Sequence, residues 1–127
     1  MKVTKLNGID KQTLKVRRGE IEACMMVLHF QDHDHFISYL PAFDLSGYGD
    51  THEESFEMLN VQVKEVLIDL IRMTPLTRLR ELKKYGWEKH SYLRKFVGPY
   101  IDEKGILKEF ELPESTSIQQ QALYLVG

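Results

Sequence analysis

The sequence lacks several features that would place the protein outside the cytoplasm or in a membrane. It contains a single cysteine, Cys24, and therefore cannot form a disulfide bond within the chain. No apolar run approaches the roughly 20 residues with which an α-helix spans a bilayer. Residues 1–5 lack the apolar core of a signal peptide. We therefore expect a protein of the reducing cytoplasm that has no association with a membrane.

Length and composition predict one folded domain over residues 1–127. The chain is 43% hydrophobic and 28% charged, which is typical of a globular protein and not of a disordered one. A domain of this size buries roughly two thirds of the surface of its unfolded chain, so it needs no disulfide or metal for stability. We divide the domain into a basic N-terminal segment (1–19), a core (20–73) and an extension (74–127).

The net charge of −2 conceals a strong separation of charge along the chain. Residues 1–19 carry six basic side chains and one acidic side chain, a charge of +5. Residues 20–70 carry eleven acids and one base, a charge of −10, and residues 71–110 carry ten bases and five acids, a charge of +5. The acidic middle would repel phosphate backbones and attract a basic protein. Solvated outer faces of strands and a helix explain the same pattern.

Alternating apolar residues predict an antiparallel sheet in the core. Apolar side chains occupy both faces of residues 20–30, as expected of a central strand that is covered on two sides. A polar turn at 31–34 leads to a second strand at 36–40, which Pro41 ends because proline has no N–H for the ladder. A short third strand is expected at 43–45. Further strands are expected near 2–6 and 13–16, and a hairpin from 96–101 and 106–112. Residues 118–126 are expected to form a final strand, with a short helix as the alternative.

A long amphipathic helix is predicted from about Thr51 to Met73. Thr51 and Glu54 match a capping box, in which two residues satisfy backbone N–H groups at the start of a helix. Apolar residues then recur at spacings of three and four, as in a helix that lies on a core. Pro75 ends this helix and begins a second one that runs to Tyr85. We therefore expect an α+β fold, an antiparallel sheet with one long helix packed on it, followed by a short helix and a β-hairpin.

Two motifs within residues 20–73 resemble the HicB-like antitoxin domain. They are Phe36-Ile-Ser-Tyr-Leu-Pro41 and Tyr48-Gly-Asp-Thr-His-Glu-Glu-Ser55, and the long helix follows them. Members of that family usually carry alanine where this chain has Ser55. The resemblance implies a partial ribonuclease H-like β-β-β-α-β fold. It also implies a non-catalytic role in bacteria, as the antitoxin of a HicA/HicB type II toxin–antitoxin system.

The resemblance implies a small basic toxin-like protein as the partner, which agrees with the acidic middle of the chain. We expect this partner to bind around the loop at 41–54 and the start of the long helix, and we expect the chain to form a homodimer or a higher homo-oligomer. Typical members add a DNA-binding motif at the C-terminus, but the tail of this chain offers no recognition helix, so DNA binding is not expected. The expected partner-binding residues are Asp44, Tyr48, Asp50, Glu53 and Glu54.

The basic segment 78–95 supports an alternative function. It interleaves cations with aromatic residues, a pattern that binds nucleic acid through phosphate contacts and stacking. The chain would then be an orphan HicB-like scaffold or an RNA-binding regulator. A solvated helix face that Leu79, Leu82 and Trp87 anchor to the core explains the same pattern, as does a surface for self-association. The candidate nucleic-acid-binding residues are Arg78, Arg80, Lys83, Lys84, Arg94 and Lys95.

Two groups of residues resemble catalytic or metal sites but have simpler explanations. The first group contains metal-ligating residue types, yet most of them fall in a polar turn. The second group could hold the metals of a nuclease, yet helix capping already explains most of its acids. Cys24 has apolar neighbours, so we expect it to pack. We expect no catalytic residue, metal or cofactor, and a metal-dependent hydrolase is the third alternative. The two groups are His29, Asp32, His33, Asp34, His35 and His52, and Asp44, Asp50, Glu53 and Glu54.

Overall fold

All strands that the structure describes pair antiparallel in one sheet, and two α-helices accompany it, so the predicted α+β class is confirmed. The computed structural model describes residues 2–6, 12–90, 95–98 and 119–126. The elements in chain order are β1 (Lys2–Leu6), β2 (Thr13–Arg17), β3 (Glu20–Asp32), β4 (His35–Leu40), a 3₁₀ turn (Pro41–Phe43), β5 (Leu45–Gly49), α1 (His52–Arg72), α2 (Pro75–Lys84), β6 (Glu88–His90), β7 (Lys95–Val97) and β8 (Gln119–Val126).

The longest strand, β3, is the centre of the sheet. On one edge it pairs with β8 between Glu22 and His29. On the other edge its first half pairs with β2 and its last residues pair with β4, which pairs with β5. The order of strands is β1-β8-β3-β2-β7-β6, and β4 and β5 branch from β3. The predicted central strand is thus confirmed.

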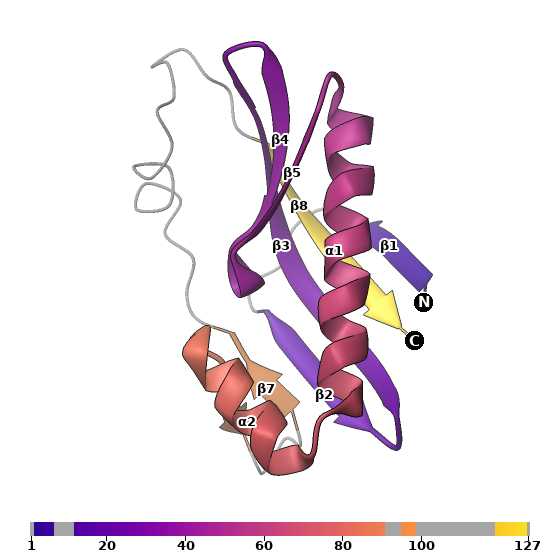
Figure 1. Cartoon of the computed structure of the whole chain (residues 1–127), viewed down its shortest axis with the longest axis vertical. Coiled ribbons are helices and arrows are strands. Elements are labelled where there is room, and N and C mark those ends of the chain that lie inside the picture. The colour runs from indigo at the N-terminus through magenta and orange to yellow at the C-terminus, as the bar shows by residue number, and fades with distance from the viewer. Residues whose placement is uncertain (1, 7–11, 91–94, 99–118, 127) are drawn as a thin grey trace.

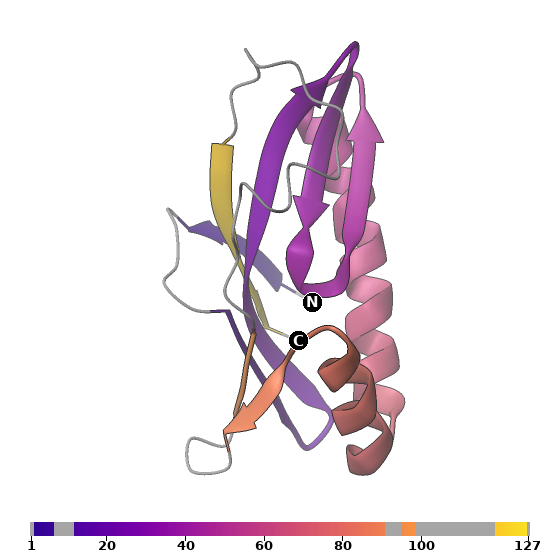
Figure 2. The same cartoon turned by 90° about the vertical axis from the view of Figure 1, so that its left-hand side faces the viewer.

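Both faces of β3 are buried. Met25 and Val27 belong to the main core, which also contains Leu59 and Val63 of α1. Leu28 and Phe30 point to the opposite face, because side chains alternate along a strand, and they form a second buried cluster. Both helices lie on the same side of the sheet (Figures 1 and 2). Neither helix in the described part of the chain is long and apolar enough to cross a membrane.

The helix α1 approaches β5 closely because two positions of that strand are glycine. A Cβ atom at Gly47 would overlap the carbonyl oxygen of Ser55 and lie 2.6 Å from the backbone nitrogen of Leu59. A Cβ atom at Gly49 would lie 2.7 Å from the backbone nitrogen of Ser55. The third strand predicted at 43–45 is therefore wrong in position. The observed strand, Leu45–Gly49, contains the two glycines, which pack against the helix instead of forming a loop.

The helices and the terminal strands agree with the predictions, but the middle of the extension does not. The helix α2 follows α1 where the expected β-β-β-α-β order requires a strand. The observed hairpin pairs β6 with β7, with Glu88 opposite Val97. The predicted hairpin at 96–101 and 106–112 overlaps only β7, and its second half lies outside the described residues. The strand β6 escaped prediction because its three residues are charged or polar and all exposed, so it has no apolar alternation.

Candidate functional site

The start of α1 uses some of the predicted partner-binding residues for its own backbone. The Oγ1 atom of Thr51 accepts a hydrogen bond from the backbone N–H of Glu54, at 3.1 Å. The Glu54 carboxylate in turn accepts from the backbone N–H of Asp50, at 2.9 Å. Thr51 therefore caps the helix as predicted, but Glu54 reaches back to Asp50 and not to the cap residue Thr51, so the two bonds do not form a reciprocal capping box. The carboxylates of Asp50 and Glu53 are exposed and have no partner among the described residues, so they remain available to a ligand.

The structure does not bring Asp44 together with the other predicted partner-binding residues. Asp44 precedes β5, whereas Asp50 and Glu53 follow it, and a five-residue strand is about 17 Å long. The Asp44 carboxylate also accepts a hydrogen bond from the hydroxyl of Tyr39, at 2.6 Å. The predicted set of five residues therefore splits between the two ends of β5.

Apolar side chains lie exposed next to the free acids. The exposed fractions are 50% for Tyr48, 50% for Met58 and 59% for Val61. The backbone N–H of Tyr48 contacts the sulfur of Met58 at 3.3 Å, so Met58 lies at the edge of β5. Gly47 and Gly49 face α1, so the side chain of Tyr48 between them points to the opposite face of the strand. Glu57 is exposed beside them on α1. We name this region the β5–α1 surface and define it by Tyr48, Asp50, Glu53, Glu57, Met58 and Val61.

Sequence reasoning missed three members of the β5–α1 surface, namely Glu57, Met58 and Val61. Glu57 is one of several acids on the exposed side of α1, so nothing in the sequence singled it out. A signal for the other two was present, since both are apolar residues that fall outside the buried stripe of α1. That stripe contains Phe56, Leu59, Val63, Leu67 and Leu70. Apolar residues off such a stripe mark a helix with a second contact face.

A buried chain of hydrogen bonds connects β3, β4 and α1. The Nδ1 atom of His29 lies 2.8 Å from the Oγ of Ser38, which lies 2.7 Å from the Oγ of Ser55. Ser55 donates its hydroxyl proton to the carbonyl oxygen of His52, at 2.8 Å. Each hydroxyl has one proton, so Ser38 donates to Ser55, and His29 donates to Ser38.

That direction has a chemical consequence for the histidine and the serine. A general base must accept the proton of the nucleophile, but His29 donates to Ser38. Ser38 and Ser55 are also fully buried, at 0% exposure. The three residues therefore join the sheet to the helix and do not form a nucleophile and its base. This role also explains why a serine at position 55 fits here.

The histidines and aspartates of the predicted turn do not converge on one point. His33 contacts its neighbour Asp32 at 2.6 Å in an exposed local pair. His52 packs edge-on against Phe36 with ring centres 4.4 Å apart, while His29 points to Ser38. Within the described ranges, no three His, Cys, Asp or Glu side chains are placed to hold a metal ion.

Cys24 is half-buried, and no acid–base partner surrounds it in the described part of the structure. Burial raises the pKa of the Cys24 thiol, because the thiolate loses hydration in the protein. The thiolate is the nucleophilic form of cysteine, so this environment makes Cys24 less reactive. The geometry agrees with the predicted packing role.

Several cations of the basic segment 78–95 are engaged within the protein. Arg78 donates to the carbonyl oxygens of Leu70, Ile71 and Met73 at 2.7, 3.2 and 3.0 Å, and thereby closes the end of α1. Lys84 forms an ion pair with Glu81 at 2.8 Å, and this hydrogen bond raises the pKa of Lys84.

The remaining predicted nucleic-acid-binding residues differ in their positions. Arg80 and Lys83 are exposed on α2 and make no ion pair among the described residues. Arg94 lies outside the described residues. Lys95 lies in β7 and lines a hollow together with residues of β2 and α2. The predicted set therefore does not act as one surface.

Trp87 anchors the basic segment to the core, as the sequence indicated. Its side chain is 1% exposed and its Nε1–H donates to the carbonyl oxygen of Ala42 at 3.1 Å. Its ring stacks on Phe43 with centres 5.7 Å apart. Leu82 is also fully buried.

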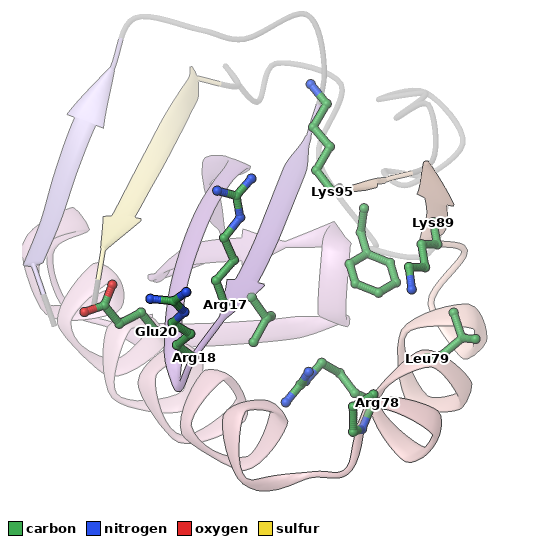
Figure 3. A pocket seen from close by; sticks show the side chains of 10 residues that line it. Arg17, Arg18, Glu20, Arg78, Leu79, Lys89 and Lys95 are labelled. Carbon is green, nitrogen blue, oxygen red and sulfur yellow. The ribbon is translucent and has the colours of Figure 1, made fainter. Parts of the chain in front are cut away.

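An open hollow of about 950 Å³ lies between α2 and the strands β2, β6 and β7 (Figure 3). Its lining contains five cations and a single acid, Glu20. Arg17 and Arg18 come from the N-terminal segment, and the other three come from the extension. We name this hollow the basic basin. It is lined by Val16, Arg17, Arg18, Glu20, Pro75, Arg78, Leu79, Lys89, Lys95 and Phe96.

Comparison of the chain with models of protein families, with curated proteins and with solved structures finds no match. The HicB-like resemblance therefore rests on the two motifs and on the order β3–β4–β5–α1, whereas α2 stands where the expected order has a strand. The chemistry of the β5–α1 surface and of the basic basin is the remaining guide to function.

Proposed function

We propose that the chain is a non-catalytic protein-binding module, similar to the antitoxin of a HicA/HicB system, that holds a small basic protein on the β5–α1 surface. One observation carries the proposal. Met58 and Val61, one helical turn apart on α1, are exposed apolar side chains, and the exposed carboxylates of Glu53 and Glu57 on the same helix make no ion pair in the described structure. A bacterial cytoplasm and the partial ribonuclease H-like fold belong to the same proposal, and β3–β4–β5 with α1 on one face supports the latter.

The arrangement of the surface resembles that of a protein–protein interface. Such interfaces have an apolar centre and a polar rim, and burial of the centre supplies most of the affinity. Met58 and Val61 would form the centre, beside the edge of β5 at the backbone of Tyr48. Asp50, Glu53 and Glu57 would form the rim, where charge mainly accelerates association with an oppositely charged partner. A basic protein is therefore the partner that fits this surface best.

Binding without catalysis also agrees with the roles of the nearby polar residues. Thr51 and Glu54 hold the start of α1, and Ser38 and Ser55 belong to the buried hydrogen-bond chain. The carboxylates of Asp50, Glu53 and Glu57 are exposed at the surface. These residues support a surface that recognises another molecule without changing its covalent bonds.

The test is a calorimetric titration with the small basic protein encoded in the adjoining reading frame. The double variant Glu53→Lys/Glu57→Lys reverses two rim charges, and we expect its affinity to fall by about tenfold or more, since steering charges change association rates by orders of magnitude. The matched control, Glu20→Lys/Glu88→Lys, changes the net charge equally at exposed positions outside the surface.

The control variant should bind like the original chain. An equal loss in both variants would mean that net charge, and not this surface, determines binding. If the adjoining frame encodes no small basic protein, or if that protein does not bind, the antitoxin proposal is wrong.

A further inference from the structure

The fold joins two basic segments that are about 60 to 80 residues apart in the sequence. The strand β2 pairs with β7, so that Thr13 lies opposite Val97 and Leu14 lies opposite Phe96. The backbone N–H of Gly98 also donates to the carbonyl oxygen of Gln12 at 2.9 Å. Residues 1–19 and residues 71–110 each carry a net charge of +5, and cations from both segments therefore line the basic basin.

Most of the charge in the basic basin has no counter-charge within the protein. Arg17, Arg18, Lys89 and Lys95 make no ion pair in the described part of the structure. Arg78 is held by carbonyl oxygens, which orient its guanidinium group but leave its positive charge uncompensated. Like charges around one hollow repel each other, and an anionic ligand would relieve that repulsion.

We propose that the basic basin binds a single-stranded nucleic acid. Two features favour a strand over a small anion. The hollow is open, whereas sites for small molecules usually enclose most of the ligand. The labelled cations are spread around the hollow on several elements instead of meeting at one point (Figure 3). That distribution suits successive phosphates along a backbone.

The apolar part of the lining favours a single strand over a duplex. Val16, Leu79 and Phe96 are half-buried and belong to the lining of the basin. Apolar and aromatic groups of this kind bind the faces of unpaired bases, which a duplex hides within its stack.

The site differs from the one that the basic segment 78–95 predicted. Arg17 and Arg18 replace Arg80 and Lys83, which are absent from the lining of the basin. It also shares no residue with the β5–α1 surface, so each of the two binding proposals can fail while the other holds.

The test is fluorescence anisotropy with a labelled uridine dodecamer, measured over a range of salt concentrations. Each phosphate contact with a single strand contributes a slope of about 0.7 in log affinity against log salt. The double variant Arg17→Gln/Lys89→Gln should lower the slope by about 1.4, equivalent to a loss of affinity of about 25-fold at about 0.1 M salt. Both residues are exposed and make no hydrogen bond in the described structure, so the fold should be unaffected.

The matched control is Arg80→Gln/Lys83→Gln, which removes the same charge from exposed positions of α2 outside the basin. Its slope of log affinity against log salt should stay within about 0.35 of the original value, which is the contribution of half a phosphate contact. A deoxyuridine dodecamer separates RNA from DNA as the source of the strand, and binding of either supports the proposal.

Three results would overturn the proposal. They are no binding of either dodecamer, an equal loss of affinity in the two double variants, and equal or tighter binding of a DNA duplex or of a polyglutamate peptide of matched charge. Tighter binding of the peptide would assign the basin to an acidic protein segment.

Discussion

The two ends of α1 carry opposite charge, and the β5–α1 surface and the basic basin are built around them. At the first turn, Glu54 accepts a hydrogen bond from the backbone and Glu53 remains free. At the last turn, Arg78 of α2 donates to the backbone of α1. Arg17 of β2 lines the basic basin and makes no ion pair in the described structure. Both arrangements follow the helix dipole, which favours anions at the start of a helix and cations at its end.

The two regions show that a charged side chain in the sequence is available to a ligand only where the backbone of the protein does not already bind it. In each region one charged side chain completes the helix, and its neighbours are the ones that a partner can reach. Variants of the residues that hold each end of α1, and of the close contact between α1 and β5, test this difference between the two regions.

The largest effect is expected where α1 meets β5, beneath the acidic region. Gly47→Ala should lower the free energy of unfolding by about 3 kcal/mol, because the added methyl group forces the helix away from the strand. Urea unfolding followed by circular dichroism measures this change. Ser46→Ala, at the neighbouring half-buried position, is the control and should change stability by less than about 0.5 kcal/mol. Equal stability of the two variants would mean that the helix does not need this close approach.

An intermediate effect is expected at the basic end of α1. Arg78→Gln should lower the free energy of unfolding by about 2 kcal/mol, because three carbonyl oxygens lose a charged donor. Thermal unfolding of Arg78→Gln and Arg80→Gln compares two arginines of the same helix. Arg80 has no partner in the described structure, so its replacement should be nearly neutral. If both variants lose the same stability, Arg78 does not close the end of α1.

The smallest effect is expected from the caps of the two helices. Thr51→Ala should cost about 1 kcal/mol, since Thr51 is the N-cap of α1 and accepts from the backbone N–H of Glu54 at 3.1 Å. Thr74→Ala should cost about 0.5 kcal/mol, because Thr74 accepts from Thr77 at 3.3 Å and Pro75 already favours the start of α2. Chemical unfolding resolves the difference, and a larger loss at Thr74 would reverse this order.

The helices and the terminal strands could be predicted because their signals are local. A cap, a spacing of three and four, and a proline at the first turn fixed both helices to within about two residues. The strand β5 was misplaced because Gly47 and Gly49 usually indicate a loop. Their actual role depends on the distance to a helix that begins after them, which a local pattern does not contain.

The candidate sites were less predictable, because they depend on which distant segments lie together. The sequence separated Asp44 from Glu53 by only nine positions, yet an extended strand places them at opposite ends. Conversely, Arg17 and Lys95 are far apart in the chain and line one basin, because β2 pairs with β7. Charge counting gave the sign of each segment but could not show which side chains the backbone uses.

The indole of Trp87 has a consequence for the boundary that the sequence suggested at residue 73. Its ring is enclosed by the same core that holds Met25 of the central strand and Leu125 of the last one, and its nitrogen is tied to Ala42. A fragment that stops at residue 73 would have a cavity in its core at the position of the Trp87 indole. It would also lack the strand β8, which pairs with β3. The extension is therefore no appendage. The chain should unfold in one cooperative step, as a single architectural unit whose first and last thirds are indispensable to the middle.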